Sequence, residues 1–232
     1  MFKNRPKTIL LGVLLALSMA FRLSPALAES VPDGPVKTFY ENGAVKEEKN
    51  YRHGKLHGGY RSYYENGVVK QAAFYQDGVL HDMAKSFFPN GKVKLEITYD
   101  KGLRQGLKKE YAETNGHLVS EEHFDKDKRE GDSLLIDPHT GRIVTKTTYV
   151  RGLREGWEIF YQKNGRPWIE SEYKEGKRNG IYRMYAPNGL LNYEYHYVND
   201  KKEGKGIVYD VYSGAPNKIA TVENYRNDEL IG

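Results

Sequence analysis

The sequence contains no cysteine among its 232 residues. This absence excludes a fold held by disulfides, thiol catalysis, a metal site with cysteine ligands and lipid attachment to an N-terminal cysteine. Hydrophobic residues are also scarce, since they make up 38% of the chain while charged residues make up 29%. What the chain has in abundance is glycine, with 24 residues, and tyrosine, with 19. A chain of this composition is not expected to bury a thick aliphatic core.

The sequence has one long hydrophobic run, and it lies near the N-terminus. A basic segment over residues 3–7 precedes the apolar residues 9–21, and a site of small residues ending at Ala28 follows. This order is typical of a cleaved signal peptide over residues 1–28, which a short linker over residues 29–33 follows. An uncleaved anchor is the alternative, but the run is shorter than the roughly 20 residues that a spanning helix needs. We therefore expect a periplasmic or secreted protein.

The formal net charge of +5 comes mostly from this N-terminal segment. Removal of residues 1–28 takes away four basic residues and no acidic ones, which leaves 32 basic and 31 acidic residues. A chain this close to neutral has no obvious attraction for phosphate backbones or anionic lipids. We expect no nucleic-acid partner, and weak or no membrane binding after the signal is removed.

Residues 34–232 consist of eight tandem repeats of 24–25 residues. Each repeat has a first aromatic position, then a turn glycine that asparagine precedes in six repeats, then a closing aromatic position. The structural repeat aromatics are Phe39, Tyr51, Tyr63, Tyr75, Phe87, Tyr99, Tyr111, Phe124, Tyr149, Tyr161, Tyr173, Tyr185, Tyr197 and Tyr209. Ile136 takes the first position in repeat 5, and Tyr225 takes the closing position in repeat 8. Spacing this regular indicates a repeat architecture.

Each repeat is predicted to form a β-hairpin. Asn-Gly between two alternating segments favours a type I′ turn, in which both central residues have positive φ. A second turn follows each closing aromatic residue, where Asp127, Asp200 and Asp228 replace a glycine and tolerate a left-handed conformation. Glycines every few residues interrupt any helical stripe. The predicted fold is all-β, an elongated single-sheet solenoid of about eight tandem antiparallel hairpins.

The two faces of the sheet are expected to differ. Residues at an even distance in sequence from the turn glycine are aliphatic and lead to the closing tyrosine, as with Val45 and Val69, each two residues after its glycine. Residues at an odd distance are charged, as with Lys46 and Glu48, three and five residues after Gly43. Because alternate residues of a strand point to opposite faces, this pattern predicts one aromatic–aliphatic face and one charged face.

Two segments carry a resemblance to a known family. They are Tyr63-Tyr64-Glu65-Asn66-Gly67 and Tyr161-Gln162-Lys163-Asn164-Gly165, each followed by a Tyr-x-x-Gly turn. They resemble MORN-type repeats, and more closely the bacterial MORN-variant repeats of proteins labelled YwqK-family antitoxins. Repeats 4, 5 and 8 depart from the pattern at their turns. The resemblance implies a non-catalytic binding scaffold, with an antitoxin or immunity role in bacteria and membrane or lipid association in eukaryotic relatives.

No motif of the sequence predicts catalysis, a cofactor or a metal. The Gly-Lys pairs lack the Ser or Thr of a phosphate-binding loop, and no Gly-x-Ser-x-Gly segment occurs. His57 and His81 take equivalent positions in adjacent repeats, but other repeats have Gln, Glu or Asn there. We expect these histidines to be solvated turn residues, and we assign no catalytic or metal-binding residue.

Aromatic residues beyond those that the repeat requires are the candidates for partner binding. They are Trp157, Trp168, Tyr182, Tyr193 and Tyr195, all in repeats 6 and 7. Trp and Tyr are enriched at interface hot spots. The alternative is that these residues only thicken the stack where curvature or capping requires it. The predicted function is binding of a protein partner, a secreted toxin of the phospholipase or wall-hydrolase type. The alternatives are an envelope scaffold that self-associates and a membrane-lipid module.

Overall fold

The computed structural model describes residues 33–213 and 215–232, so the predicted signal peptide lies outside the described residues. The described part is all β-structure and turns, and it contains no helix. The strands are β1 (Gly34–Phe39), β2 (Val45–Arg52), β3 (Lys55–Leu56), β4 (Gly58–Tyr63), β5 (Val69–Gln76), β6 (Val79–Phe87), β7 (Val93–Asp100), β8 (Leu103–Tyr111), β9 (Leu118–Asp125), β10 (Lys128–Arg129), β11 (Gly131–Ile136), β12 (Ile143–Val150), β13 (Leu153–Tyr161), β14 (Pro167–Lys174), β15 (Lys177–Tyr185), β16 (Leu191–Val198), β17 (Lys201–Lys202), β18 (Gly204–Tyr209), β19 (Ile219–Arg226) and β20 (Glu229–Leu230).

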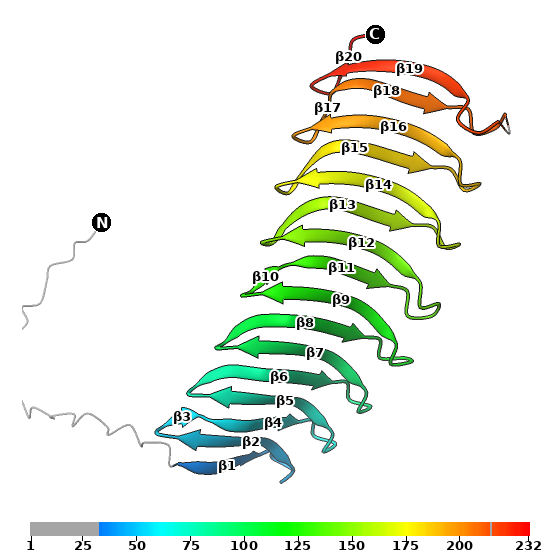
Figure 1. Ribbon diagram of the computed structural model, residues 1–232. Helices are drawn as coiled ribbons and strands as arrows, with labels where there is room; N and C mark the ends of the chain where they lie inside the picture. The colour runs from blue at the N-terminus through cyan, green and yellow to red at the C-terminus, as the bar shows by residue number, and fades with distance from the viewer. Residues whose placement is uncertain (1–32, 214) are drawn as a thin grey trace, which may run out of the picture. The chain divides into compact units, whose positions relative to one another are not determined.

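These strands form one antiparallel sheet in which chain neighbours are sheet neighbours. β2 pairs with both β3 and β4, β9 with β10 and β11, and β16 with β17 and β18. β3 and β4 are therefore two parts of one strand that a single residue interrupts, and the same holds for β10 with β11 and for β17 with β18. Figure 1 shows the succession of hairpins from blue to red, with the strands bowed in the same direction. The prediction of a single sheet of eight tandem hairpins is confirmed.

The Asn-Gly turns are not of the predicted type. In repeat 2 the amide of Gly67 donates to the carbonyl of Tyr64 at 2.9 Å, and the amide of Tyr64 donates to Val68 at 2.8 Å. Gly67 has a φ of +80°, whereas Asn66 is not in the left-handed region. This is a three-residue loop of the type I kind closed by a left-handed glycine. The side-chain oxygen Oδ1 of Asn66 accepts a hydrogen bond from the Val68 amide at 3.1 Å, which holds the asparagine in its right-handed conformation.

The type I′ turns lie at the opposite margin of the sheet. Asp77 and Gly78 have φ values of 50° and 91°, and they connect the paired residues Gln76 and Val79. Asp127, which replaces a glycine at this position, has a φ of 68°. Asp200 and Asp228 behave in the same way, so the prediction that aspartate takes the left-handed position is confirmed.

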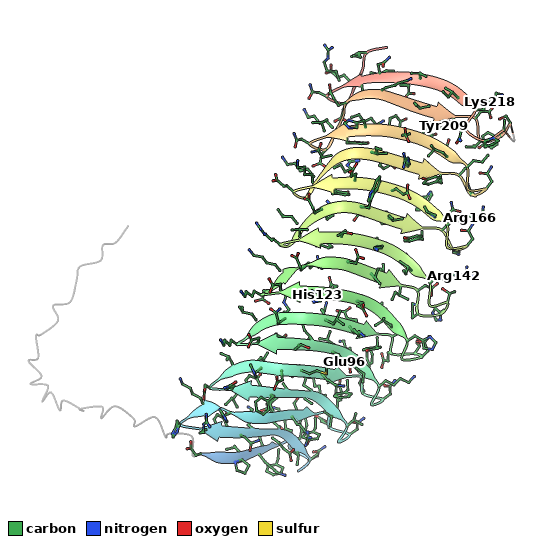
Figure 2. The ribbon with its side chains drawn as sticks, in the orientation of Figure 1. Glu96, His123, Arg142, Arg166, Tyr209 and Lys218 are labelled. Carbon is green, nitrogen blue, oxygen red and sulfur yellow. The ribbon has the colours of Figure 1, made fainter. Side chains whose placement is uncertain are left out.

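Side chains at the Asn-Gly margin connect each repeat to the next. The Asn66 side-chain amide donates to the carbonyl of Pro89 at 3.2 Å, and Asn115 donates to Pro138 at 2.7 Å. The residue after the turn glycine adds a second link, as where Arg166 donates to the carbonyl of Asn188 at 3.2 Å. Figure 2 shows Arg166 at this margin. The asparagine is therefore selected for two bonds, one within its own turn and one to the neighbouring turn.

A bulge in every hairpin changes which residues share a face. Ser62 pairs with Gln71 but Tyr63 pairs with Val69, so Lys70 has no partner in the register. The extra residue moves the aliphatic positions to the face that the first aromatic occupies, because a one-residue shift reverses side-chain direction. Tyr63 lies on that face, where its hydroxyl donates to Glu48 at 2.7 Å. The closing tyrosines point to the other face, which we call the closing-tyrosine face.

The prediction of one aromatic–aliphatic face and one charged face is therefore wrong. Opposite the closing tyrosines lies what we call the ladder face, because a single row of cross-strand neighbours crosses it from end to end. The members of this charge ladder are Lys37, Glu48, Arg61, Ala72, Lys85, Glu96, Lys109, Glu121, Leu134, Lys146, Ile159, Glu170, Arg183, Glu194, Ile207 and Val222. Aromatic and aliphatic side chains accompany it on the same face.

The sheet has no thick core. None of the described side chains is completely buried, and the best-covered aromatics are Phe124, Tyr173 and Tyr197 on the closing-tyrosine face. Packing on this face is supplied by neighbouring strands rather than by a second layer. This agrees with the expectation from composition.

Candidate functional site

The closing-tyrosine face is built from rings and cations that alternate along the sheet. The guanidinium of Arg104 lies 4.3 Å from the ring centroid of Phe124, and that of Arg154 lies 4.0 Å from Tyr173. Arg178 makes the same contact with Tyr197 at 4.3 Å. Cation–π pairs of this kind each contribute about 0.5–1 kcal/mol at exposed sites. Each of these contacts connects one repeat to the next and restricts the position of the closing ring.

Additional tyrosines gather on this face in repeats 7 and 8. We call Tyr182, Tyr193, Tyr195, Tyr197 and Tyr225 the tyrosine cluster. Tyr193 stacks on Tyr195 with centroids 6.1 Å apart and planes 13° apart, and Tyr182 lies 5.7 Å from Tyr197. Tyr195 meets Tyr225 edge-on at 5.7 Å. Three of the five predicted binding residues are thus brought together.

The cluster surrounds one ammonium group and one carboxylate. The Lys202 ammonium lies 3.9 Å from the ring centroid of Tyr195 and 4.6 Å from that of Tyr225. The Glu223 carboxylate accepts the hydroxyls of Tyr195 at 3.3 Å and Tyr225 at 2.7 Å. Burial, followed by the Glu223 charge, raises the pKa of Tyr195 above its ordinary value. These contacts fix the inner rings of the cluster.

Two outer hydroxyls of the cluster have no such partner. Among the described residues, neither the Tyr182 hydroxyl nor the Tyr193 hydroxyl makes a hydrogen bond, in contrast to Tyr195 and Tyr225. Burial of the ring raises the pKa of Tyr182, so its hydroxyl stays protonated and able to donate. The cluster therefore presents rigid rings together with donors that a bound partner can use.

The two tryptophans lie elsewhere. Trp157 pairs with Glu172 and points to the ladder face. Trp168 takes the bulge position between Pro167 and Ile169, and the residue is 48% exposed. The structure does not bring either residue into the tyrosine cluster, and their role in binding stays a prediction.

One glycine that sequence reasoning missed makes the cluster possible. Gly206 faces Tyr195, and a Cβ atom at residue 206 would lie 2.6 Å from the ring of Tyr195 and 3.3 Å from that of Tyr225. Equivalent positions in other repeats hold larger side chains, such as Tyr60 and Lys108. The only signal in the sequence is that a glycine replaces a side chain where the extra tyrosines are most frequent.

Of the two histidines singled out in the sequence, His57 contacts a type I′ turn, and His81 lies 3.5 Å from a carboxylate oxygen of Asp100. The Nδ1 atom of His57 lies 3.2 Å from a carboxylate oxygen of Asp77 and 3.4 Å from its amide nitrogen. In other repeats the same position is filled by Gln105 or Glu130, which accept the equivalent amides at 3.1 and 2.8 Å. No group of three or more metal-ligating side chains occurs within the described residues. These positions close turns.

Comparison with known families fits this geometry. Four segments of the chain match the family described as MORN repeat variant, at residues 32–53, 56–77, 83–101 and 178–199. These four segments are similar to MORN repeat variants. The matched segments fall in repeats 1, 2, 3 and 7, and they include the segment 63–67. Repeats 4, 5 and 8, which have altered turns, lie outside the matches, and so does repeat 6 with the segment 161–165. A comparison with curated proteins finds no match. Within the part of the chain that the structure describes, no helix is long and apolar enough to cross a membrane.

Proposed function

We propose that this chain is an exported, non-catalytic protein that binds a protein partner, and that the partner is a secreted toxin which it neutralises. The tyrosine cluster is the observation that carries the proposal. Tyr182, Tyr193 and Tyr195 exceed what a MORN repeat requires, and they lie together on one face. Because Tyr presents a large, rigid, amphipathic ring, it is enriched where binding energy concentrates.

The order within the cluster supports binding of a preformed kind. Tyr195 is fixed by Lys202 and Glu223, and Tyr193 stacks on it, so little rotamer freedom remains for a partner to remove. A partner then loses less free energy to side-chain ordering. The hydroxyls of Tyr182 and Tyr193 supply polar contacts at the rim of these rings.

The arrangement of charges supports a role without catalysis. Carboxylates and cations of the ladder face pair across neighbouring strands, as in Lys85–Glu96 at 2.6 Å and Arg183–Glu194 at 2.8 Å. Such pairs hold the carboxylates ionised, and the pKa of Glu96 lies below its ordinary value because Lys85 and the Tyr111 hydroxyl bond to it. A carboxylate that acts in acid–base catalysis needs a pKa shifted in the opposite direction, upward toward neutral pH.

The proposed place of action follows from the N-terminal sequence. A signal peptide over residues 1–28 carries the protein out of the cytosol, so a toxin that it neutralises acts outside the cytosol as well. Enzymes that attack phospholipids or the cell wall meet this condition. The MORN-type resemblance to antitoxins points to the same role by analogy.

Co-expression with the product of a neighbouring toxin gene, followed by affinity capture, tests the proposal. Tyr193→Ala is expected to weaken the complex by about tenfold or more, since truncation of a hot-spot residue costs on the order of 1–2 kcal/mol. Trp157→Ala is the comparison variant, because this aromatic residue lies on the ladder face and its predicted role in binding is tested in the same experiment. Unchanged affinity in Tyr193→Ala, or capture that recovers no toxin, contradicts the proposal. Loss of affinity in Trp157→Ala alone would move the contact to the ladder face.

A further inference from the structure

One cation of the charge ladder lacks the partner that all the others have. Five of its cations form ion pairs, namely Lys37 with Glu48, Lys85 with Glu96, Lys109 with Glu121, Lys146 with Asp132 and Arg183 with Glu194. Arg61 makes no ion pair with any described residue, and its side chain is exposed. The nearest carboxylate in the row, Glu48, is already occupied, because Lys37 takes one oxygen at 2.7 Å and the Tyr63 hydroxyl takes the other at 2.7 Å.

The missing partner corresponds to a particular position of the repeat. Arg61 pairs in register with Ala72, and Ala72 pairs with Lys85. In the equivalent position other repeats have a glutamate, as at Glu48, Glu96 and Glu121. The uncharged Ala72 therefore lies between two cations, Arg61 of repeat 2 and Lys85 of repeat 3. The two flanking strands are about 10 Å apart, a gap that one carboxylate between two long side chains can bridge.

The sheet is hollowed at the same place. A cavity of about 380 Å³ on the ladder face is lined by Gly59, Ala72, Phe74 and Met83, together with Arg61, Lys85 and the already paired Glu48. The small residues form its floor, since a Cβ added at Gly59 would meet no atom within 4 Å. Phe74 is 39% exposed and Met83 is 51% exposed. The hollow thus combines a guanidinium that forms no ion pair within the described residues with two apolar side chains that are open to solvent.

We propose that this hollow binds an acidic segment of a protein partner, in which an Asp or Glu side chain is flanked by apolar residues. The partner's carboxylate takes the place that glutamate has in the other repeats, and it pairs with Arg61. Its apolar neighbours cover Phe74 and Met83. Charge complementarity selects this occupant, because a carboxylate is the group that the row lacks. The site lies on the ladder face of repeats 2 and 3, so it is independent of the tyrosine cluster.

Methyl NMR of the full chain tests the proposal with two short peptides as probes, acetyl-Leu-Glu-Leu-amide and acetyl-Leu-Gln-Leu-amide. Met83 lines the hollow, and Met184 lies on the closing-tyrosine face, so their methyl signals report the site and a control position in one spectrum. The Glu peptide is expected to shift the Met83 signal and leave the Met184 signal unchanged. The Gln peptide is expected to bind about fivefold more weakly, the contribution of one exposed ion pair.

Two variants separate this site from nonspecific binding. Arg61→Gln is expected to remove the preference for the Glu peptide, and Ala72→Glu to abolish binding by completing the ladder within the chain. Both changes lie at solvent-accessible positions of a sheet that is otherwise unaltered. Equal binding of the two peptides, no shift of Met83, or full binding by Ala72→Glu would each overturn the proposal. None of these results depends on whether the protein neutralises a toxin.

Discussion

A methyl group at Gly206 should disturb the tyrosine cluster more than any other change of that size. The added Cβ would lie 2.6 and 2.7 Å from two ring atoms of Tyr195, whereas carbon atoms in contact prefer about 3.5–4 Å. The ring must therefore move by about 1 Å. That movement disturbs its contacts with Lys202 at 3.9 Å and with Tyr193, as well as its hydrogen bond to Glu223.

We expect Gly206→Ala to lower the free energy of unfolding by about 1–3 kcal/mol, the usual cost of overpacking. Urea unfolding followed by near-ultraviolet circular dichroism measures both the stability and the order of the tyrosine rings. Gly59→Ala is the matched control, because Gly59 is also a strand glycine without positive φ and its Cβ would meet no atom within 4 Å. That substitution should be neutral or stabilising by about 0.4–1 kcal/mol, since alanine restricts the unfolded chain. Equal stability of the two variants would refute the reasoning.

Three further predictions concern the ladder face and its turns. The lowered pKa of Glu96 means that its contribution to stability is present above about pH 4.5 and is lost as pH falls through the folded value; Glu96→Gln should flatten acid unfolding curves. Burial and the Glu96 charge raise the pKa of Tyr111 to about 12. The contribution of Tyr111 to stability is therefore complete below pH 10 and lost between pH 10 and 12. The difference in phenolate absorbance between the unmodified protein and Tyr111→Phe measures this titration. Asn66→Ala removes one bond within its turn and one to Pro89, and should cost about 1–2 kcal/mol in urea unfolding, whereas Glu65→Ala in the same turn should cost under about 0.5 kcal/mol.

The succession of hairpins could be predicted because each repeat contains, in its own sequence, the signals for its strands and turns. Strand length, turn glycines and closing aromatics recur in every unit, so no long-range information is needed to place the strands. The turn type was missed at Asn66 because Asn-Gly is compatible with more than one loop, and the choice depends on a side-chain bond to Val68. At the other margin, the left-handed conformation of Asp127 could be predicted because Asp127 replaces a glycine of most other repeats.

The assignment of faces failed for one physical reason. Lys70 lies in a bulge and has no partner on the neighbouring strand. A prediction from strict alternation of side chains does not include such an extra residue. The same limit applied to the binding residues. Tyr182 and Tyr195 could be seen as extra aromatics, but only the register shows that they are cross-strand partners in one row while Trp157 points away from it.

The bulge also determines how the molecule can change in length. Each repeat contains two strands with one bulge inside its hairpin, and the register shifts again where one hairpin pairs with the next, as between Ala72 and Phe74. After one complete unit, equivalent side chains lie on the same face again. Gain or loss of a whole unit therefore leaves both faces continuous, whereas removal of a single bulge residue such as Lys70 would reverse the strand segment on one side of it. Length in this architecture is free to vary only in whole repeats, and the contacts that a partner meets can be moved along the sheet without being rebuilt.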